Sequence, residues 1–189
     1  MKKIPTLFER EFENHKVCGI RNAVTPGLEW VLAGEGTATI KIDGSCCAII
    51  DGVFYKRYDA KRGKNPPEGA IPCCDPDPVT GHWPHWLKVS ETDNANRWLL
   101  EAYRNSNGDN LDDGTYEAIG PHFQANPYNL NHDVIERHGI RILHDVPRTF
   151  EGIREYLSSH NIEGIVFWKD GAPQCKIKRS DFGFKWPNN

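Results

Sequence analysis

One stretch in the first third of the chain constrains the fold more than any other. It holds the apolar run Ala38–Ile42 and a second apolar run, 48–55, which Asp51-Gly52 interrupts. β-branched and apolar residues bounded by glycine turns are typical of short strands. Asp-Gly between two such runs predicts a tight hairpin turn. We therefore expect antiparallel sheets in this part of the chain.

Lys41 lies at the end of the first of these runs, and Asp43-Gly44 follows it. A strand end holds a side chain more firmly than a loop tip does, and a glycine lets the backbone approach a phosphate closely. A lysine amine with an ordinary pKa of about 10.4 is a poor nucleophile unless nearby cations or a metal favour its neutral form. The alternative is a lysine on a hairpin beside a type I′ turn.

Three later segments carry charged residues on expected strands. Glu117 lies within Tyr116–Gly120, Glu163 opens the apolar run that follows it, and Lys176 and Lys178 flank one isoleucine. Strand alternation places those two lysines on the same face. Two ammonium groups directed into one pocket repel each other unless an anion is bound, so a triphosphate is the expected ligand.

In chain order, the segments Lys41–Gly44, Tyr116–Gly120, Glu163–Val166 and Lys176–Lys178 resemble four motifs of the covalent nucleotidyltransferase superfamily. This superfamily includes ATP-dependent RNA ligases, DNA ligases and mRNA capping enzymes. The strings KIDGSCC, PDPVTGHWP and YEAIGPHFQANPY are similar to a group of small 5′-to-3′ RNA ligases of bacteria, viruses and animals. The resemblance implies an α+β nucleotidyltransferase (adenylation) domain, in which helices flank antiparallel sheets.

The resemblance also implies a role for each matching residue. Lys41 would attack the α-phosphate of ATP and form lysyl-AMP, with Asp43 and Gly44 completing the nucleophile motif. Glu117 would bind the ribose hydroxyl, and Glu163 would hold the catalytic metal ion, magnesium or manganese. The remaining residues would contact phosphate, and they are Arg57, which is otherwise a surface cation at a strand end, and Lys176 and Lys178.

An aromatic ring downstream of Glu117 would stack on adenine in the resembling family. Phe123 and Tyr128 are both candidates, and the sequence leaves the choice open. Phe123 is equally suited to a hydrophobic core, and Tyr128 is equally suited to a turn.

The length of 189 residues predicts one adenylyltransferase domain over 1–189. The eleven residues that follow Lys178 leave no room for the C-terminal domain that related ligases often append. The segment 61–90 is rich in proline, glycine and tryptophan, and we expect it to engage the substrate. Within it, His82–Trp86 fits an aromatic anchor on the core better than a platform that stacks RNA bases.

RNA with 5′-phosphate and 3′-hydroxyl ends is the partner that the resemblance implies. The net charge of −3 does not indicate a polyanion ligand, but basic residues gather at 56–64 and 169–185 and are suited to local phosphate contacts. Two alternatives remain, a capping-type guanylyltransferase that uses GTP and a noncatalytic module that binds nucleotide or RNA. A monomer is the default expectation.

No apolar run reaches the length of a membrane helix, and the charged N-terminal residues do not form a signal peptide. We therefore expect a cytoplasmic protein, bacterial or in the host cytoplasm if viral. Six reduced cysteines fit this better than disulfides or a zinc site, because Cys46-Cys47 and Cys73-Cys74 are adjacent pairs.

Two helices and one further strand complete the expected elements. Apolar residues at helical spacing predict a helix over 94–105, and Thr149 predicts the N-cap of a second helix that ends near Ser159. The apolar run Trp30–Ala33 predicts a strand that pairs with the run carrying Lys41. For the histidines at 132, 138 and 144, surface positions are expected.

Overall fold

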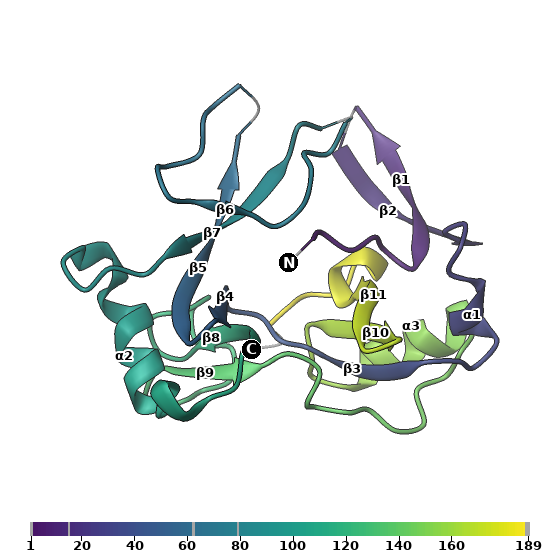
Figure 1. The fold of residues 1–189 in the computed structure, drawn as a ribbon. Helices are drawn as coiled ribbons and strands as arrows, with labels where there is room; N and C mark the ends of the chain where they lie inside the picture. The colour runs from purple at the N-terminus through teal and green to yellow at the C-terminus, as the bar shows by residue number, and fades with distance from the viewer. Residues whose placement is uncertain (1, 15, 62, 79, 188–189) are drawn as a thin grey trace. The chain divides into compact units, whose positions relative to one another are not determined.

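The computed structural model describes residues 2–14, 16–61, 63–78 and 80–187. It is an α+β protein in which every pairing between the named strands is antiparallel (Figure 1). The α+β class and the predominance of antiparallel sheets are therefore confirmed. Among the described helices, none has the length and apolar character needed to cross a membrane.

The chain forms two compact units, which are described separately. The six-strand unit comprises Asp43–His138 with the described residues of Met1–Lys3. The three-strand unit comprises Ile4–Ile42 and the described residues of Gly139–Asn189. The latter is thus built from two separate stretches, and Asp43–His138 lies between them in sequence. One adenylyltransferase domain over 1–189 stays a prediction.

The three-strand unit is named after its central sheet, whose strand order is β11-β10-β3. A separate two-stranded hairpin, β1-β2, precedes it. The elements of the unit are β1 (Phe8–Glu13), β2 (Lys16–Val24), α1 (Glu29–Leu32), β3 (Thr37–Lys41), α3 (Phe150–Ser159), β10 (Gly164–Lys169), β11 (Ala172–Lys178) and the 3-10 helix η3 (Arg179–Phe182).

The core of this unit lies on one face of the central sheet. Alternate residues of β10 and β11, including Ile165, Phe167 and Ile177, are fully buried there. They pack with Ile153 and Leu157 of α3. Because strand neighbours point to opposite faces, the residues of β11 that lie between the buried ones are directed away from this core.

The predicted strand over Trp30–Ala33 is wrong, because this segment forms the short helix α1. Leu28 and Val31 are both buried, and a spacing of three residues places them on one side of a helical turn. Gly34, with φ of 89°, follows the helix and reverses the chain. A four-residue apolar run fits either element, and here burial at helical spacing decides.

The second predicted helix is confirmed as α3. The Thr149 side chain accepts a hydrogen bond from the backbone N of Gly152, so it is the N-cap. The helix ends at Ser159, as expected.

The six-strand unit is named after a sheet of order β6-β7-β5-β4-β8-β9. Its elements are β4 (Ser45–Ile50), β5 (Val53–Ala60), β6 (Ile71–Pro72), β7 (Trp83–Lys88), α2 (Arg97–Asn105), β8 (Gly114–Ile119), β9 (Val134–Arg137), and the 3-10 helices η1 (Asn94–Asn96) and η2 (Gly108–Asn110). The predicted helix over 94–105 is confirmed as η1 followed by α2.

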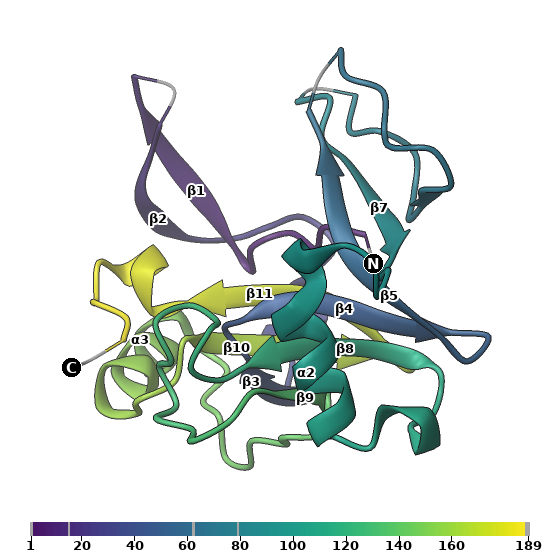
Figure 2. The ribbon, with the colours of Figure 1, turned by 90° about the vertical axis from the view of Figure 1, so that its left-hand side faces the viewer.

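Helix α2 covers one face of this sheet, and Figure 2 shows it in front of β8 and β9. Its apolar residues pack on a cluster of buried side chains from β4, β5 and β8, which includes Cys47, Ile49 and Tyr116. The opposite face of these strands is therefore the one left for polar side chains.

The expected hairpin turn at Asp51-Gly52 is confirmed. Both residues have positive φ, 51° and 69°, as a type I′ turn requires. The Asp113 carboxylate accepts hydrogen bonds from both of their backbone N atoms, at 2.7 and 3.0 Å.

The segment 61–90 includes two strands, β6 and β7, that extend the sheet. His85 and Trp86 of β7 are buried, and Trp83 Nε1 donates to the carbonyl of Cys74. These contacts fit the interpretation of the aromatic cluster as an anchor.

Candidate active site

The predicted nucleophile lies at the last position of β3 and is part of a row of residues across the three-stranded sheet. Register pairs Gly164 of β10 with Lys41 on one side and with Lys178 on the other. In an antiparallel pair, residues directly opposite each other point to the same face. Lys41 and Lys178 therefore extend from the same face, about 10 Å apart at their backbones because two strand spacings separate them.

Lys176 occupies the next row of the same face. It pairs with Val166 of β10, which pairs with Thr39 of β3. Cys175 and Ile177, which alternate with the two lysines of β11, are fully buried. The expectation that Lys176 and Lys178 share a face is confirmed. The sheet thus has one apolar face and one face that carries three lysines.

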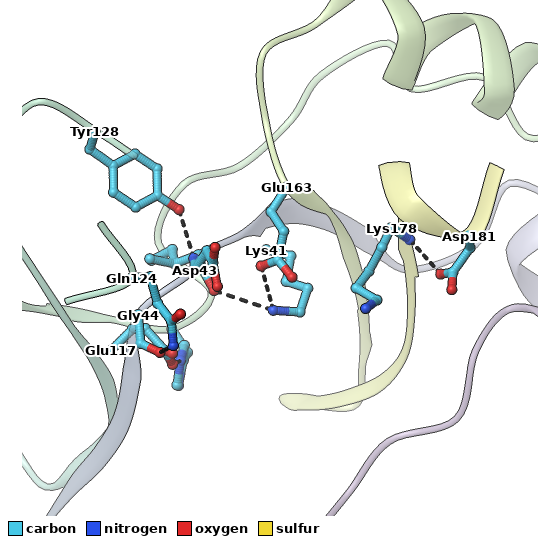
Figure 3. Close-up of polar contacts among 11 residues, drawn as sticks. Lys41, Asp43, Gly44, Glu117, Gln124, Tyr128, Glu163, Lys178 and Asp181 are labelled. Atoms are coloured by element: carbon cyan, nitrogen blue, oxygen red, sulfur yellow. Dashed lines mark hydrogen bonds and ion pairs between the residues drawn. The ribbon is translucent and has the colours of Figure 1, made fainter. Parts of the chain in front are cut away.

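Glu163 provides the carboxylate next to the predicted nucleophile. Lys41 Nζ lies 2.6 Å from Glu163 Oε2, and the two side chains are only 22% and 12% exposed (Figure 3). Glu163 immediately precedes β10, whose first residue, Gly164, lies opposite Lys41, so register brings the backbones of the two charged residues near each other. The two residues are 122 positions apart in sequence, and the pairing of β10 with β3 brings them together.

The lysine face is electrostatically crowded. The pKa of Lys176 falls to about 8, first because burial penalises its charged form and then because Lys41, Lys178 and Arg10 add positive charge nearby. Glu163 acts in the opposite direction. Excess positive charge on a partly buried surface is the electrostatic condition for binding an anion.

Asp43-Gly44 does not form the hairpin turn that the alternative interpretation required. Lys41 ends β3 in one sheet, and Ser45 begins β4 in another. A Cβ at Gly44 would lie 2.1 Å from the carbonyl O of Ala118 in β8. Close packing on β8 therefore requires a glycine at this position. The expected contact of Gly44 with phosphate stays a separate prediction.

The two aromatic candidates for adenine differ in the contacts that they make. Phe123 is 7% exposed and belongs to the core of the six-strand unit. Tyr128 is half-buried, and its hydroxyl oxygen accepts a hydrogen bond of 2.6 Å from the backbone N of Asp43 (Figure 3). Of the two rings, that of Tyr128 is the more accessible.

Arg57 and Glu117 lie on the face of the six-stranded sheet opposite α2. Glu117 pairs with Cys46 of β4, and Arg57 follows Lys56, the partner of Cys47. Continuing this antiparallel register by one residue places Arg57 beside Cys46. Two residues that are sixty positions apart in sequence therefore belong to one row. Arg57 Nε also donates to Asp59 Oδ1 at 2.9 Å.

His138 is a site residue that sequence reasoning missed. The surface position expected for it is wrong, because its side chain is only 13% exposed and its Nε2 lies 2.8 Å from Glu117 Oε2. Its Nδ1 lies 3.0 Å from Thr115 Oγ1. Only the pairing of β8 with β9 brings these residues together, and no local motif marks it. His132 and His144 are exposed, as expected.

The structure thus brings the predicted residues together in two sets. Lys41, Glu163, Lys176 and Lys178 share one face of the three-strand unit. Asp43, Gly44, Arg57 and Glu117 belong to the six-strand unit, where the last two share a row. No model of a known protein family matches the chain, and no match is found among curated proteins.

Proposed function

We propose that the protein is an ATP-dependent RNA ligase with a nucleotidyltransferase fold, which seals 5′-phosphate and 3′-hydroxyl ends through lysyl-AMP. One observation carries the proposal. A mostly buried lysine at a strand end is paired with Glu163 and shares its sheet face with two further lysines, and all four residues fall in motifs that resemble those of this superfamily.

The first step is adenylylation of Lys41. The lone pair of the neutral Nζ attacks the α-phosphorus of ATP, and the bond from that phosphorus to the oxygen bridging to the β-phosphate breaks. The electron pair leaves with pyrophosphate, and the attacking nitrogen releases a proton to solvent. Lys176 and Lys178 stabilise the charge that develops on the α-phosphate, which is the main contribution a protein makes to phosphoryl transfer.

Glu163 is suited to hold a divalent cation in this step. Mg²⁺ bound with a nucleotide commonly takes one or two carboxylates from the protein and completes its shell with water and phosphate oxygens. A single, mostly buried carboxylate 2.6 Å from the nucleophile fits this pattern once the neutral amine has turned to the phosphate. The cation would neutralise phosphate charge.

Glu117 and one aromatic ring are the residues that the resemblance assigns to the nucleoside. Glu117 is buried and fixed by His138, so it presents a carboxylate of defined orientation to a ribose hydroxyl. Tyr128 is the better candidate for stacking on adenine, because Phe123 is in the core. Arg57, 19% exposed and held by Asp59, would contact phosphate.

Two further transfers complete the reaction. The 5′-phosphate of RNA attacks the phosphorus of lysyl-AMP, so that AMP moves to the RNA and Lys41 is released. A 3′-hydroxyl then attacks the activated 5′-phosphate, forms the phosphodiester and expels AMP. Neither transfer needs another covalent protein group, so positioning and charge neutralisation provide the catalysis.

The test is incubation of the protein with magnesium and α-labelled ATP or GTP. Label retained by the protein with ATP supports a ligase, label with GTP alone supports a capping-type enzyme, and no label with either refutes covalent nucleotidyl transfer. Sealing of 5′-phosphorylated RNA or DNA then identifies the substrate.

A matched pair of variants makes the test specific. Lys41→Ala is expected to abolish labelling. Lys88→Ala removes an exposed lysine that also ends a strand, β7, and is expected to label like the wild type. Equal labelling of the two variants would refute the assignment of the nucleophile.

A further inference from the structure

The N-terminal segment of the chain extends the edge of the lysine-bearing sheet. Lys176 N donates to the carbonyl of Pro5, and Leu7 N donates to the carbonyl of Lys176, at 3.0 and 2.8 Å. Thr6 thus lies beside Lys176 in a parallel bridge. Leu7 and Phe8 are buried in the core and anchor the segment. Strand β1 begins at Phe8, and the side chain of Arg10 within it lies near Asp181, in the 3-10 helix that follows β11.

Arg10 is incompletely paired. Its Nη2 lies 3.8 Å from Asp181 Oδ1, which is longer than a hydrogen bond. The other oxygen of that carboxylate already accepts from the backbone N of Lys178 at 2.8 Å. Arg10 Nε is buried and has no hydrogen-bond partner within the described part of the chain. A buried donor without a partner is costly, so this nitrogen is suited to receive an oxygen from a ligand.

The surroundings of Arg10 are rich in cationic side chains. Lys176 is close to three other cationic side chains. The charges of Arg10, Lys41 and Lys178 all lower its pKa. Among the described residues, Glu163 contacts Lys41 and Asp181 lies near Arg10. Positive charge gathered at Arg10, Lys176 and Lys178 favours a polyanion as the ligand. The β- and γ-phosphates of a triphosphate carry negative charge beyond that of the α-phosphate.

The order of these cations across the sheet has a mechanistic consequence. Lys41 is on β3 at one edge, Lys176 and Lys178 are on β11, and Arg10 follows the segment on the outer side of β11. In a phosphoryl transfer the attacking and leaving atoms lie on opposite sides of phosphorus. A phosphate attacked from Lys41 and steadied by the lysines of β11 would release its leaving group towards Arg10.

We propose that Arg10 binds the β- and γ-phosphates of ATP and stabilises pyrophosphate as it leaves. This inference rests on the proposed function. The planar fork of a guanidinium fits two phosphate oxygens at once, whereas an ammonium acts as a point charge. When the bond between the α-phosphorus and the bridging oxygen breaks, the electron pair moves onto that oxygen, and Arg10 receives the added charge.

The test separates pyrophosphate from the other phosphate source, the 5′-end of RNA. Arg10→Gln keeps a polar side chain and removes the charge. We expect ATP-dependent labelling of Lys41 to slow by about 10- to 100-fold, the loss typical of a charge-assisted hydrogen bond. Sealing of RNA that is already adenylylated involves no pyrophosphate and should stay within about twofold of wild type. Release of ATP from lysyl-AMP protein by added pyrophosphate should slow in parallel with labelling.

Arg21→Gln is the matched control, because Arg21 lies on the partner strand β2 and is paired with Glu9. It should leave all three reactions unchanged, and thermal unfolding checks that both variants fold. Unchanged labelling by Arg10→Gln would overturn the inference, and so would an equal loss in sealing of adenylylated RNA. If the wild type is not labelled, the proposed function fails. Calorimetric binding of inorganic pyrophosphate to wild type and Arg10→Gln then still tests Arg10 on its own.

Discussion

Replacement of Lys176 by methionine should stabilise the protein while it removes the proposed labelling by ATP. Lys176 is largely buried among other cations, and its pKa falls from 10.5 to about 8. At about 1.4 kcal/mol for each pKa unit, the protonated side chain costs the native state roughly 3 kcal/mol. Methionine has a similar length and no charge. We therefore expect Lys176→Met to raise the free energy of unfolding by about 1–3 kcal/mol at pH 7 without nucleotide.

The pH dependence gives the sign of this effect. At pH 7 the ammonium is protonated in both states, so the native protein bears the whole cost. Between pH 8 and 10.5 the unfolded chain still binds a proton that the native protein has released, and the stability of the wild type rises with pH. The difference between wild type and Lys176→Met should therefore shrink across this window.

Urea unfolding at several pH values measures the difference. Lys185→Met, which changes an exposed lysine of the same unit, should show neither the gain nor its pH dependence. Lys176→Met should also label poorly with ATP, because we assign Lys176 to the α-phosphate. A residue that lowers stability without ligand and raises activity is typical of the trade-off at functional sites. A variant that is less stable than wild type at pH 7, or a difference that does not change with pH, would refute the electrostatic reasoning.

Three further changes test other parts of the structure. Gly44→Ala should lower the free energy of unfolding by about 1–3 kcal/mol in urea unfolding, because its Cβ would lie 2.1 Å from a backbone oxygen of β8. A Cβ at Gly19 meets nothing closer than 3.6 Å, so an equal loss in Gly19→Ala would contradict this reasoning. His138→Ala should reduce the discrimination between ATP and 2′-deoxy-ATP in labelling, because the carboxylate at 117 loses a partner at 2.8 Å, and exposed His132→Ala should not. Asp113→Ala should lower the free energy of unfolding by about 1 kcal/mol in the same assay, because two turn N–H groups lose their acceptor. An unchanged free energy would show that water replaces the carboxylate.

The sequence predicted those features that depend on residues close together in the chain, namely a helix N-cap, a hairpin turn and the alternation of side chains along a strand. Thr149 begins α3 because its side chain accepts a backbone hydrogen bond within the first turn, and Asp51-Gly52 forms the hairpin turn because both residues adopt positive φ. The shared face of Lys176 and Lys178 follows from strand alternation alone. The run Trp30–Ala33 was misassigned because four apolar residues carry no reliable period.

Contacts between distant segments were not predictable in the same way. His138 reaches Glu117 only because β9 pairs with β8, and the N-terminal segment reaches the lysine-bearing sheet only because residues 5–7 pair beside Lys176. No motif within either segment specifies these pairings. The pairing of Lys41 with Glu163 also depends on distant contacts, since only the pairing of β10 with β3 places Gly164, the residue after Glu163, opposite Lys41.

The discontinuous three-strand unit determines when the site forms during synthesis. The six-strand unit, Asp43–His138, leaves the ribosome before β10 and β11 exist. Strand β3 and the N-terminal segment must wait for these last strands, and closing such long loops is slow. We expect nascent chains that end before residue 163 to contain a folded six-strand unit and an amine without its carboxylate. Lys41 would thus acquire its electrostatic surroundings only after residues 163–178 have been synthesised.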